Sequence, residues 1–175
     1  MAGWLGGAKG AQWTVGVAVM LEIARLWHET GHQPRRTVLF AVWAAQEVGQ
    51  VGLRRYVQAP AVPIEDLVAV LHLGAVGGGE GYYLGAEGDM DQDGLLRFTM
   101  ERAEEVLDGR LSVSSPPTRD DPVALFREAG IPTLRLRWRE ASRENWPTEY
   151  ADEVQPYRLG VTGRMVTLAL MALAR

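Results

Sequence analysis

The stretch TVLFAVWAAQEVGQVGLRRYV, residues 37–57, most constrains what this 175-residue chain can fold into. It opens with an apolar run rich in β-branched and aromatic residues, with no polar side chain at alternate positions. This composition predicts a strand over 37–44 that is buried on both faces, as in a parallel sheet covered by helices. Gly49 and Gly52 then allow a tight turn into a short helix near 50–58.

Gln46 and Glu47 follow this strand directly. In open α/β sheets, ligands bind in the crevice beyond the carboxyl ends of the strands. The two polar side chains therefore occupy the position where a functional site is expected.

The rest of the chain alternates predicted helices and strands. Apolar residues at helical spacing, with Gly31 and Pro34 as stop signals, predict a helix over 14–30. Further helices are predicted over 94–107, between Asp121 and Gly130, and from Pro156 to about Ala174, and further strands over 67–76, 82–84, 111–114 and 133–138. In 133–138 apolar residues alternate with arginine, which indicates an edge or partly wetted strand. This order predicts one α/β domain over 1–175, a three-layer α/β/α sandwich with a mixed, mainly parallel sheet. Residues 1–13, rich in glycine, are expected to form a loop or arm.

Composition excludes several classes of function. The chain has no cysteine, so it has neither a disulfide framework nor a thiolate nucleophile or metal ligand. Its formal net charge is −4 and its arginines are spread along the chain, which argues against nucleic-acid binding. We find no signal peptide and no apolar run long enough to span a membrane, so we expect no membrane partner and a cytoplasmic location.

Several stretches in order resemble the co-catalytic zinc aminopeptidase family, which includes leucyl aminopeptidases, glutamate carboxypeptidases and the protease-like domain of the transferrin receptor. They are GVAVMLEIARL, RRTVLFAVWAAQEVGQVGLRRYV, VAVLHLGAVG, LFREAGIPTLRLRW and NWPTEYADEVQPYRLG, and they span most of residues 11–175. The resemblance implies a zinc-exopeptidase-like fold. It also implies a pair of zinc ions held by histidine and carboxylate ligands, with a glutamate as general base.

Most of the residues that would carry this chemistry are replaced. By the resemblance, the bridging aspartate matches Gln12, the general base matches Gln46, a second aspartate ligand matches Gly74 and the last histidine ligand matches Asn145. Only Glu47 keeps a ligand's carboxylate, and no residue of this sequence matches the family's first histidine. We therefore expect no catalytic residue, no metal site and no bound cofactor, although zinc is expected for the family.

Possible replacement ligands are few. His72 lies two residues before Gly74 on the same strand face, but a histidine in an apolar strand is typically a hydrogen-bonded core residue. His28 and His32 have helical spacing, yet Gly31 is expected to end the helix between them, leaving both facing solvent. Asp120 and Asp121 are more typical of a helix cap than of a metal site.

Tryptophans accompany the replaced positions. Trp13 follows Gln12, Trp146 follows Asn145 and Trp43 ends the central strand. The predicted pocket thus comprises Gln12, Trp13, Trp43, Gln46, Glu47, Gly74, Asn145 and Trp146. One interpretation is a former metal site that apolar side chains now fill, where the loss of carboxylates relieves their mutual repulsion. The other is a pocket that binds a small molecule or a peptide end without cleaving it. Glu47 would need a donor such as Arg54 or the Gln46 amide.

Two functional hypotheses remain open. The first is a catalytically inactive zinc-peptidase-like domain that serves as a binding or assembly module. The second is a metallo-aminopeptidase whose zinc site is rebuilt or completed by a partner.

The resemblance also implies a further strand in the middle of the sheet, which this sequence does not contain. The strands at 37–44 and 67–76 must then pair directly or receive a strand from elsewhere. We expect a homo-oligomer or a protein partner that completes the sheet.

Overall fold

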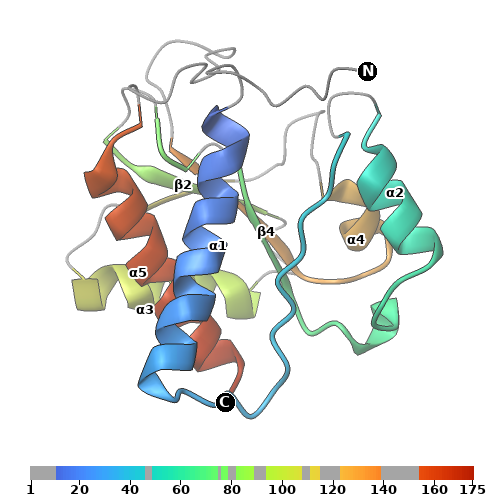
Figure 1. Ribbon diagram of the computed structural model, residues 1–175, viewed down its shortest axis with the longest axis horizontal. Helices are drawn as coiled ribbons and strands as arrows, with labels where there is room; N and C mark the ends of the chain where they lie inside the picture. The colour runs from blue at the N-terminus through green and yellow to red at the C-terminus, as the bar shows by residue number, and fades with distance from the viewer. Residues whose placement is uncertain are drawn as a thin grey trace.

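The computed structural model describes residues 11–45, 49–74, 76–78, 82–88, 94–107, 111–114, 123–138 and 154–175. Helices and strands are interspersed along the chain (Figure 1). The elements are α1 (Ala11–Thr30), α2 (Val51–Gln58), the 3₁₀ turn η1 (Ile64–Asp66), β1 (Val70–Leu73), β2 (Leu84–Gly88), α3 (Gly94–Leu107), β3 (Leu111–Ser114), α4 (Ala124–Glu128), β4 (Thr133–Trp138) and α5 (Pro156–Leu173). No helix among these residues combines the length and apolar character needed to cross a bilayer.

The four described strands form one mixed sheet in the order β1-β4-β2-β3. β1 pairs with β4 in parallel and β2 pairs with β3 in parallel, whereas β2 and β4 are antiparallel. The predicted mixed, mainly parallel sheet is confirmed. For 133–138 the predicted edge position is wrong, because β4 lies between β1 and β2, but the alternative of a partly wetted strand agrees with the intermediate burial of Arg135 and Arg137.

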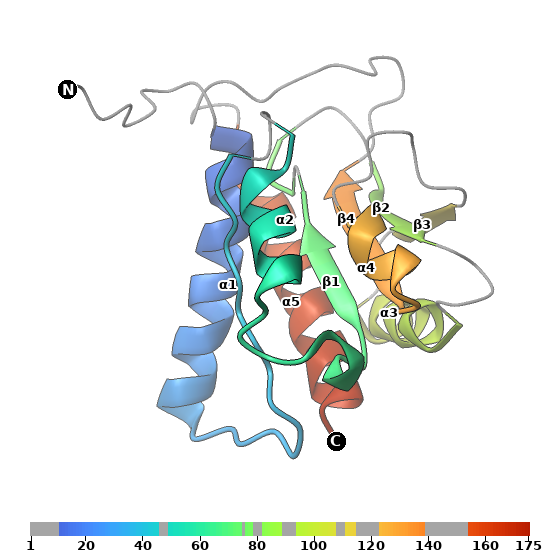
Figure 2. The same cartoon turned by 90° about the vertical axis from the view of Figure 1, so that its right-hand side faces the viewer.

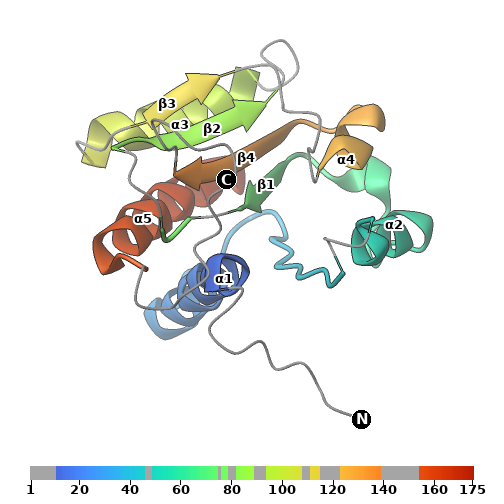
Figure 3. The same ribbon diagram turned by 90° about the horizontal axis from the view of Figure 1, so that it is seen from above.

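Two apolar clusters cover the two faces of the sheet and make it the middle of three layers. The larger cluster joins α1, α3 and α5 to side chains of β2 and β4, including Leu84 and Leu136. The smaller one joins α2 to α4 and also contacts Val70 of β1. Seen from above, α1 and α5 lie together on one side of the sheet (Figure 3).

The two faces explain the arginine pattern of β4. Leu134, Leu136 and Trp138 point into the larger cluster and are almost fully buried. Arg135 and Arg137 alternate with them and so point to the opposite face, on which α2 and α4 are the helices within the described residues. The alternation therefore indicates that one face of β4 is partly exposed, and not that β4 is an edge strand.

Helix ends follow the stop signals in the sequence. α1 ends at Thr30 and Gly31 follows with a positive φ of 67°. Pro156 opens α5 at its first turn, where its missing N–H costs no hydrogen bond. α1 begins at Ala11, so residues 11–13 are helical and the loop predicted there is wrong. Residues 1–10 lie outside the described part of the chain.

The central prediction of a strand over 37–44 is also wrong. Residues 37–45 run upward between α1 and α2 as an irregular segment that belongs to no sheet (Figures 1 and 2). β1 is shorter than the predicted strand over 67–76. No described strand pairs with residues 37–45, and β1 begins at Val70 because its partner strand β4 begins at Thr133.

Candidate functional site

The carboxyl end of β1 is where the family resemblance places a metal-binding aspartate, at Gly74. The Gly74 amide donates to the Leu136 carbonyl at 2.9 Å, which extends the pairing with β4 by one residue. A Cβ built on Gly74 would lie 3.5 Å from Nε of Arg135 and 3.3 Å from the Leu136 oxygen. A guanidinium, which is always positively charged, thus lies against the position from which a ligand carboxylate would project.

A charged pair, Arg137 with Glu87, lies on the same face of the sheet as Arg135. Arg137 donates from Nε to Oε1 of Glu87 at 2.8 Å, and the Glu87 side chain is only 4% exposed. Since Glu87 of β2 stands opposite Arg135 in the ladder, all three charged side chains share one face of the sheet. Sequence reasoning missed this group. The alternating arginines of 133–138 were the available signal, but they were interpreted only as an edge or a partly wetted strand.

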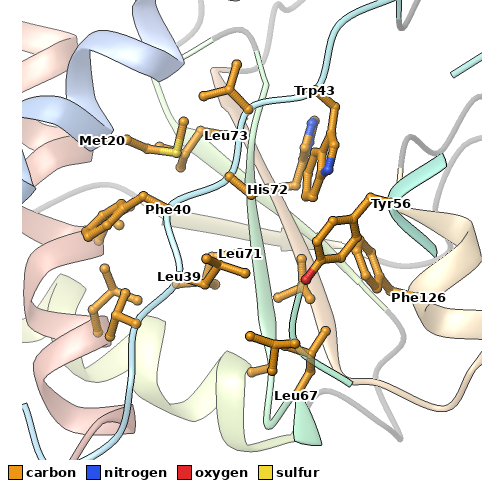
Figure 4. A pocket seen from close by; sticks show the side chains of 18 of the residues that line it. Met20, Leu39, Phe40, Trp43, Tyr56, Leu67, Leu71, His72, Leu73 and Phe126 are labelled. Atoms are coloured by element: carbon orange, nitrogen blue, oxygen red, sulfur yellow. The ribbon is translucent and has the colours of Figure 1, made fainter. Parts of the chain in front are cut away.

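Trp43 takes part in an aromatic group with side chains of α2 and α4. Its ring centroid lies 5.7 Å from that of Tyr56 in α2 and 5.9 Å from that of Phe126 in α4. Tyr56 and Phe126 are in turn 6.2 Å apart. The group attaches the end of the 37–45 segment to the face of α2 and α4 (Figure 4).

The remaining predicted pocket residues cannot be placed side by side. Gln46, Glu47, Asn145 and Trp146 lie outside the described residues, and Gln12 and Trp13 are described only as backbone of α1. Of the pocket predicted from sequence, Trp43 lines the cavity described below and Gly74 does not. Arg54, the predicted partner of Glu47, donates from Nε to the Gly49 carbonyl at 2.9 Å.

The replacement ligands do not assemble into a metal site. His28 is exposed, as predicted, but His32 is half-buried, because the turn at Gly31 folds its ring back to 4.8 Å from that of Trp27. His72 lies within β1, and Asp120 and Asp121 are outside the described residues. Among the residues that the structure describes, no group of three histidine, aspartate or glutamate side chains could hold a metal ion.

The main cavity lies between β1 and the 37–45 segment. Its volume is about 640 Å³, within the range of ligand pockets. Apolar side chains form most of its walls, with Met20, Leu39 and Phe40 on one side and Leu71 and Leu73 on β1 (Figure 4). Arg36, Tyr56, Asp66 and His72 are its titratable lining residues within the described chain.

Comparison with known proteins identifies the family. The pattern of peptidase family M28 matches residues 11–173. The chain belongs to peptidase family M28. The predicted zinc-peptidase-like family is thereby confirmed.

Solved M28-like structures share the fold. BSAP, a zinc aminopeptidase from Bacillus subtilis, superposes on 92% of this chain with a TM-score of 0.78 and 22% sequence identity. An aminopeptidase from Aneurinibacillus sp. strain AM-1 covers the same share with a TM-score of 0.77 and 23% identity. The probable glutamate carboxypeptidase AMP1 from Arabidopsis thaliana is 32% identical over 85 residues, which is 46% of this chain.

The chain is much shorter than these proteins. It spans 41% of the Bacillus enzyme, 39% of the Aneurinibacillus enzyme and 12% of the Arabidopsis protein. At this identity, the solved structures show a common fold and nothing about activity in this chain.

The residues present do not fit the zinc pair that the M28 resemblance implies. Gly74 offers no ligand atom, and the Arg135 guanidinium beside it would repel a divalent cation. The resemblance alone assigns Gln12, Gln46 and Asn145 to the other positions, and neutral amides there would not offset the charge of two cations.

Proposed function

We propose that this chain is an M28 peptidase-fold module that does not hydrolyse peptides and that binds a polypeptide partner instead. The observation that carries the proposal is the approach of Arg135 to Gly74, with Nε 3.5 Å from the place where a side chain would begin. A fixed positive charge therefore lies next to the position where the resemblance places a carboxylate ligand. Even if a nearby residue supplied a substitute ligand, the charge of Arg135 would still oppose a cation.

The binding role is supported by the cavity beside β1. It is large, mostly apolar and bounded by the sheet, and such cavities are the usual place for a bound molecule. The second hypothesis, a metallo-aminopeptidase completed by a partner, would use Glu47 as its remaining carboxylate ligand.

The test measures zinc and hydrolysis on the purified chain. We expect substoichiometric zinc by elemental analysis after dialysis, and no hydrolysis of leucyl-p-nitroanilide with or without added zinc. The Bacillus subtilis aminopeptidase, assayed in parallel, is the positive control. Zinc near two ions per chain, with turnover abolished by a chelator, would establish the metallo-aminopeptidase instead.

A pair of variants tests the charge argument directly. Gly74→Asp restores the carboxylate, but we expect it to form an ion pair with Arg135 and bind no zinc. Gly74→Asp combined with Arg135→Gln removes that competitor and should gain measurable zinc affinity. If Gly74→Asp alone binds zinc as well as the double variant, Arg135 does not oppose a cation there.

A further inference from the structure

A second cavity lies at the end of the molecule opposite to Gly74. α1 and α5 both end there, and the turn that follows α1 meets residues 171–175 (Figures 1 and 2). The volume of this cavity is about 390 Å³, within the range of ligand pockets. His32, Gln33, Arg35 and Arg175 supply its polar side chains, and Pro34 and Met171 supply apolar ones. The cavity thus has two guanidinium groups, an imidazole and an amide in its lining, and no carboxylate side chain.

The segments that meet at this cavity contain no acidic residue. Residues 30–46 have no aspartate or glutamate, and neither do residues 154–175. The chain as a whole has a formal net charge of −4, so this depletion is local. Glu29, which directly precedes the first segment, forms an ion pair with Arg25 on α1. The two segments therefore provide positive side chains to the cavity without a carboxylate to neutralise them.

The helix ends account for only part of this positive charge. Cations are favourable at the C-terminus of a helix, where the last carbonyls lack partners within the helix. At the end of α5, the Leu173 carbonyl accepts from Nη1 of Arg36 at 2.6 Å, and the Ala174 carbonyl accepts from the amides of Arg35 and Arg36 at 2.8 and 3.1 Å. Arg36 thus covers the end of α5. The guanidinium groups of Arg35 and Arg175 form no hydrogen bond or ion pair with the residues that the structure describes.

His32 adds a hydrogen-bonding nitrogen that the fold leaves unused. Its amide donates to the Trp27 carbonyl at 2.9 Å, and its ring centroid lies 4.8 Å from that of Trp27, so the imidazole is held against α1. Nε2 of His32 is buried and has no hydrogen-bond partner within the described chain. A buried polar atom without a partner costs free energy, and a bound group that accepts from Nε2–H would remove that cost.

The charges select the chemistry of the ligand. Guanidinium groups bind phosphate oxygens through two parallel hydrogen bonds. A phosphate group carries between about 1.5 and 2 negative charges at pH 7, which matches Arg35 and Arg175, whereas a single carboxylate matches only one of them. The cavity is several-fold larger than a phosphate group, and Pro34 and Met171 can contact the small organic part of an ester.

We propose that the cavity lined by His32, Arg35 and Arg175 binds a phosphate group, either as free phosphate or as a small phosphate monoester. The two guanidinium groups pair with the phosphate oxygens, and Nε2 of His32 donates a hydrogen bond to one of them. This site lies at the opposite end of the molecule from Gly74, so it goes beyond the proposed function and does not depend on it.

The test follows the histidine rings by NMR while inorganic phosphate is added at constant ionic strength. The chain has three histidines, so His28 and His72 serve as internal references. We expect a saturable chemical-shift change at Nε2 of His32, with a Kd in the millimolar range or below, and no saturable change at His28 or His72. Acetate, with a single negative charge, should bind at least about tenfold more weakly.

Three variants separate a built site from general attraction of an anion. Arg35→Gln should weaken phosphate binding at least about tenfold, measured by calorimetry. Arg55→Gln, the same change at an exposed position of α2, should leave binding unaltered. His32→Phe keeps an aromatic ring against Trp27 but removes the donor, and it should weaken binding by about threefold to tenfold. Thermal unfolding of each variant confirms that it is folded.

Glycerol 3-phosphate, titrated in parallel, distinguishes the two sources of the phosphate group. Binding at least about tenfold tighter than that of inorganic phosphate supports the site as one for an ester, and equal binding supports it as one for free phosphate.

Three results would overturn the site. His32 shows no saturable change at tens of millimolar phosphate, acetate binds as tightly as phosphate, or Arg35→Gln and Arg55→Gln weaken binding equally. None of these results alters the zinc and hydrolysis measurements, which test the proposed function separately.

Discussion

Two segments of the molecule show that apolar composition alone does not make a strand. Residues 37–43, TVLFAVW, have the stronger strand composition, yet they form no strand. Residues 84–88, LGAEG, contain two glycines and an alanine, yet they form β2 and are completely buried. The difference is pairing, because β2 has β4 on one side and β3 on the other.

The comparison extends to two lateral regions of the molecule, called here the closed side and the open side. On the closed side, formed by β2 and β4 under α3 and α5, Leu84, Ala86 and Leu136 are fully buried. On the open side, formed by β1 and the 37–45 segment, every residue of β1 is only partly buried. A segment whose backbone groups have no neighbouring strand among the described residues stays out of the sheet, even when its side chains favour burial.

The largest expected effect tests this contrast with two matched leucines. Leu136→Ala on β4 should lower the free energy of unfolding by about 2–5 kcal/mol, because it leaves a cavity in a close-packed core. Leu71→Ala on β1 should cost no more than about 1.5 kcal/mol, since that side chain is already partly exposed. Urea denaturation of both variants is the measurement. Equal losses would mean that the open side is as well packed as the closed one.

A smaller effect is expected from the buried hydrogen bond of the closed side. Trp138 donates from Nε1 to Oγ1 of Thr162 at 3.2 Å, with both side chains buried. Thr162→Val keeps the shape but leaves the indole N–H without its acceptor, which should cost about 1–2 kcal/mol.

Thr167→Val is the matched control, because the Thr167 hydroxyl donates only within α5, to the Gly163 carbonyl. We expect the control to change stability by no more than about 0.5 kcal/mol. Similar losses in the two variants would show that the Trp138 bond adds nothing specific to the closed side.

The smallest effect on stability is expected on the exposed face of α1. It gives a reference value for a substitution that touches neither the closed nor the open side. Arg25 forms ion pairs with Glu22 and Glu29, and it holds the pKa of the Glu22 carboxyl below its usual value. Both partners are exposed, so Arg25→Ala should reduce stability only slightly at pH 7 and low salt.

The sign of the pH dependence follows from that lowered pKa. The stabilisation is present above the unfolded pKa of Glu22 and is lost as the pH falls through its folded pKa. Thermal unfolding of the variant and the parent chain should therefore converge in acid and at high salt. A difference that persists in acid would point to lost packing instead of lost charge pairing.

Local signals in the sequence predicted much of the fold. Helical spacing located α1 and α3, Gly31 and Pro156 set helix boundaries, and the order of elements indicated a three-layer sandwich with a mixed sheet. These features depend on neighbours in the chain, where the relevant physics is local. The M28 family was likewise indicated by sequence.

Tertiary structure decided the rest, because pairing and charge placement depend on residues far apart in the chain. The sequence alone could not show that 37–45 would be anchored to α2 and Ala174 and held away from β1. Nor could it show that Arg135, more than 60 residues after Gly74, would place its guanidinium where a metal ligand was expected. A strand forms only where a neighbouring strand satisfies its backbone hydrogen bonds. The charge at a site depends on all the ionised side chains that the fold places near it.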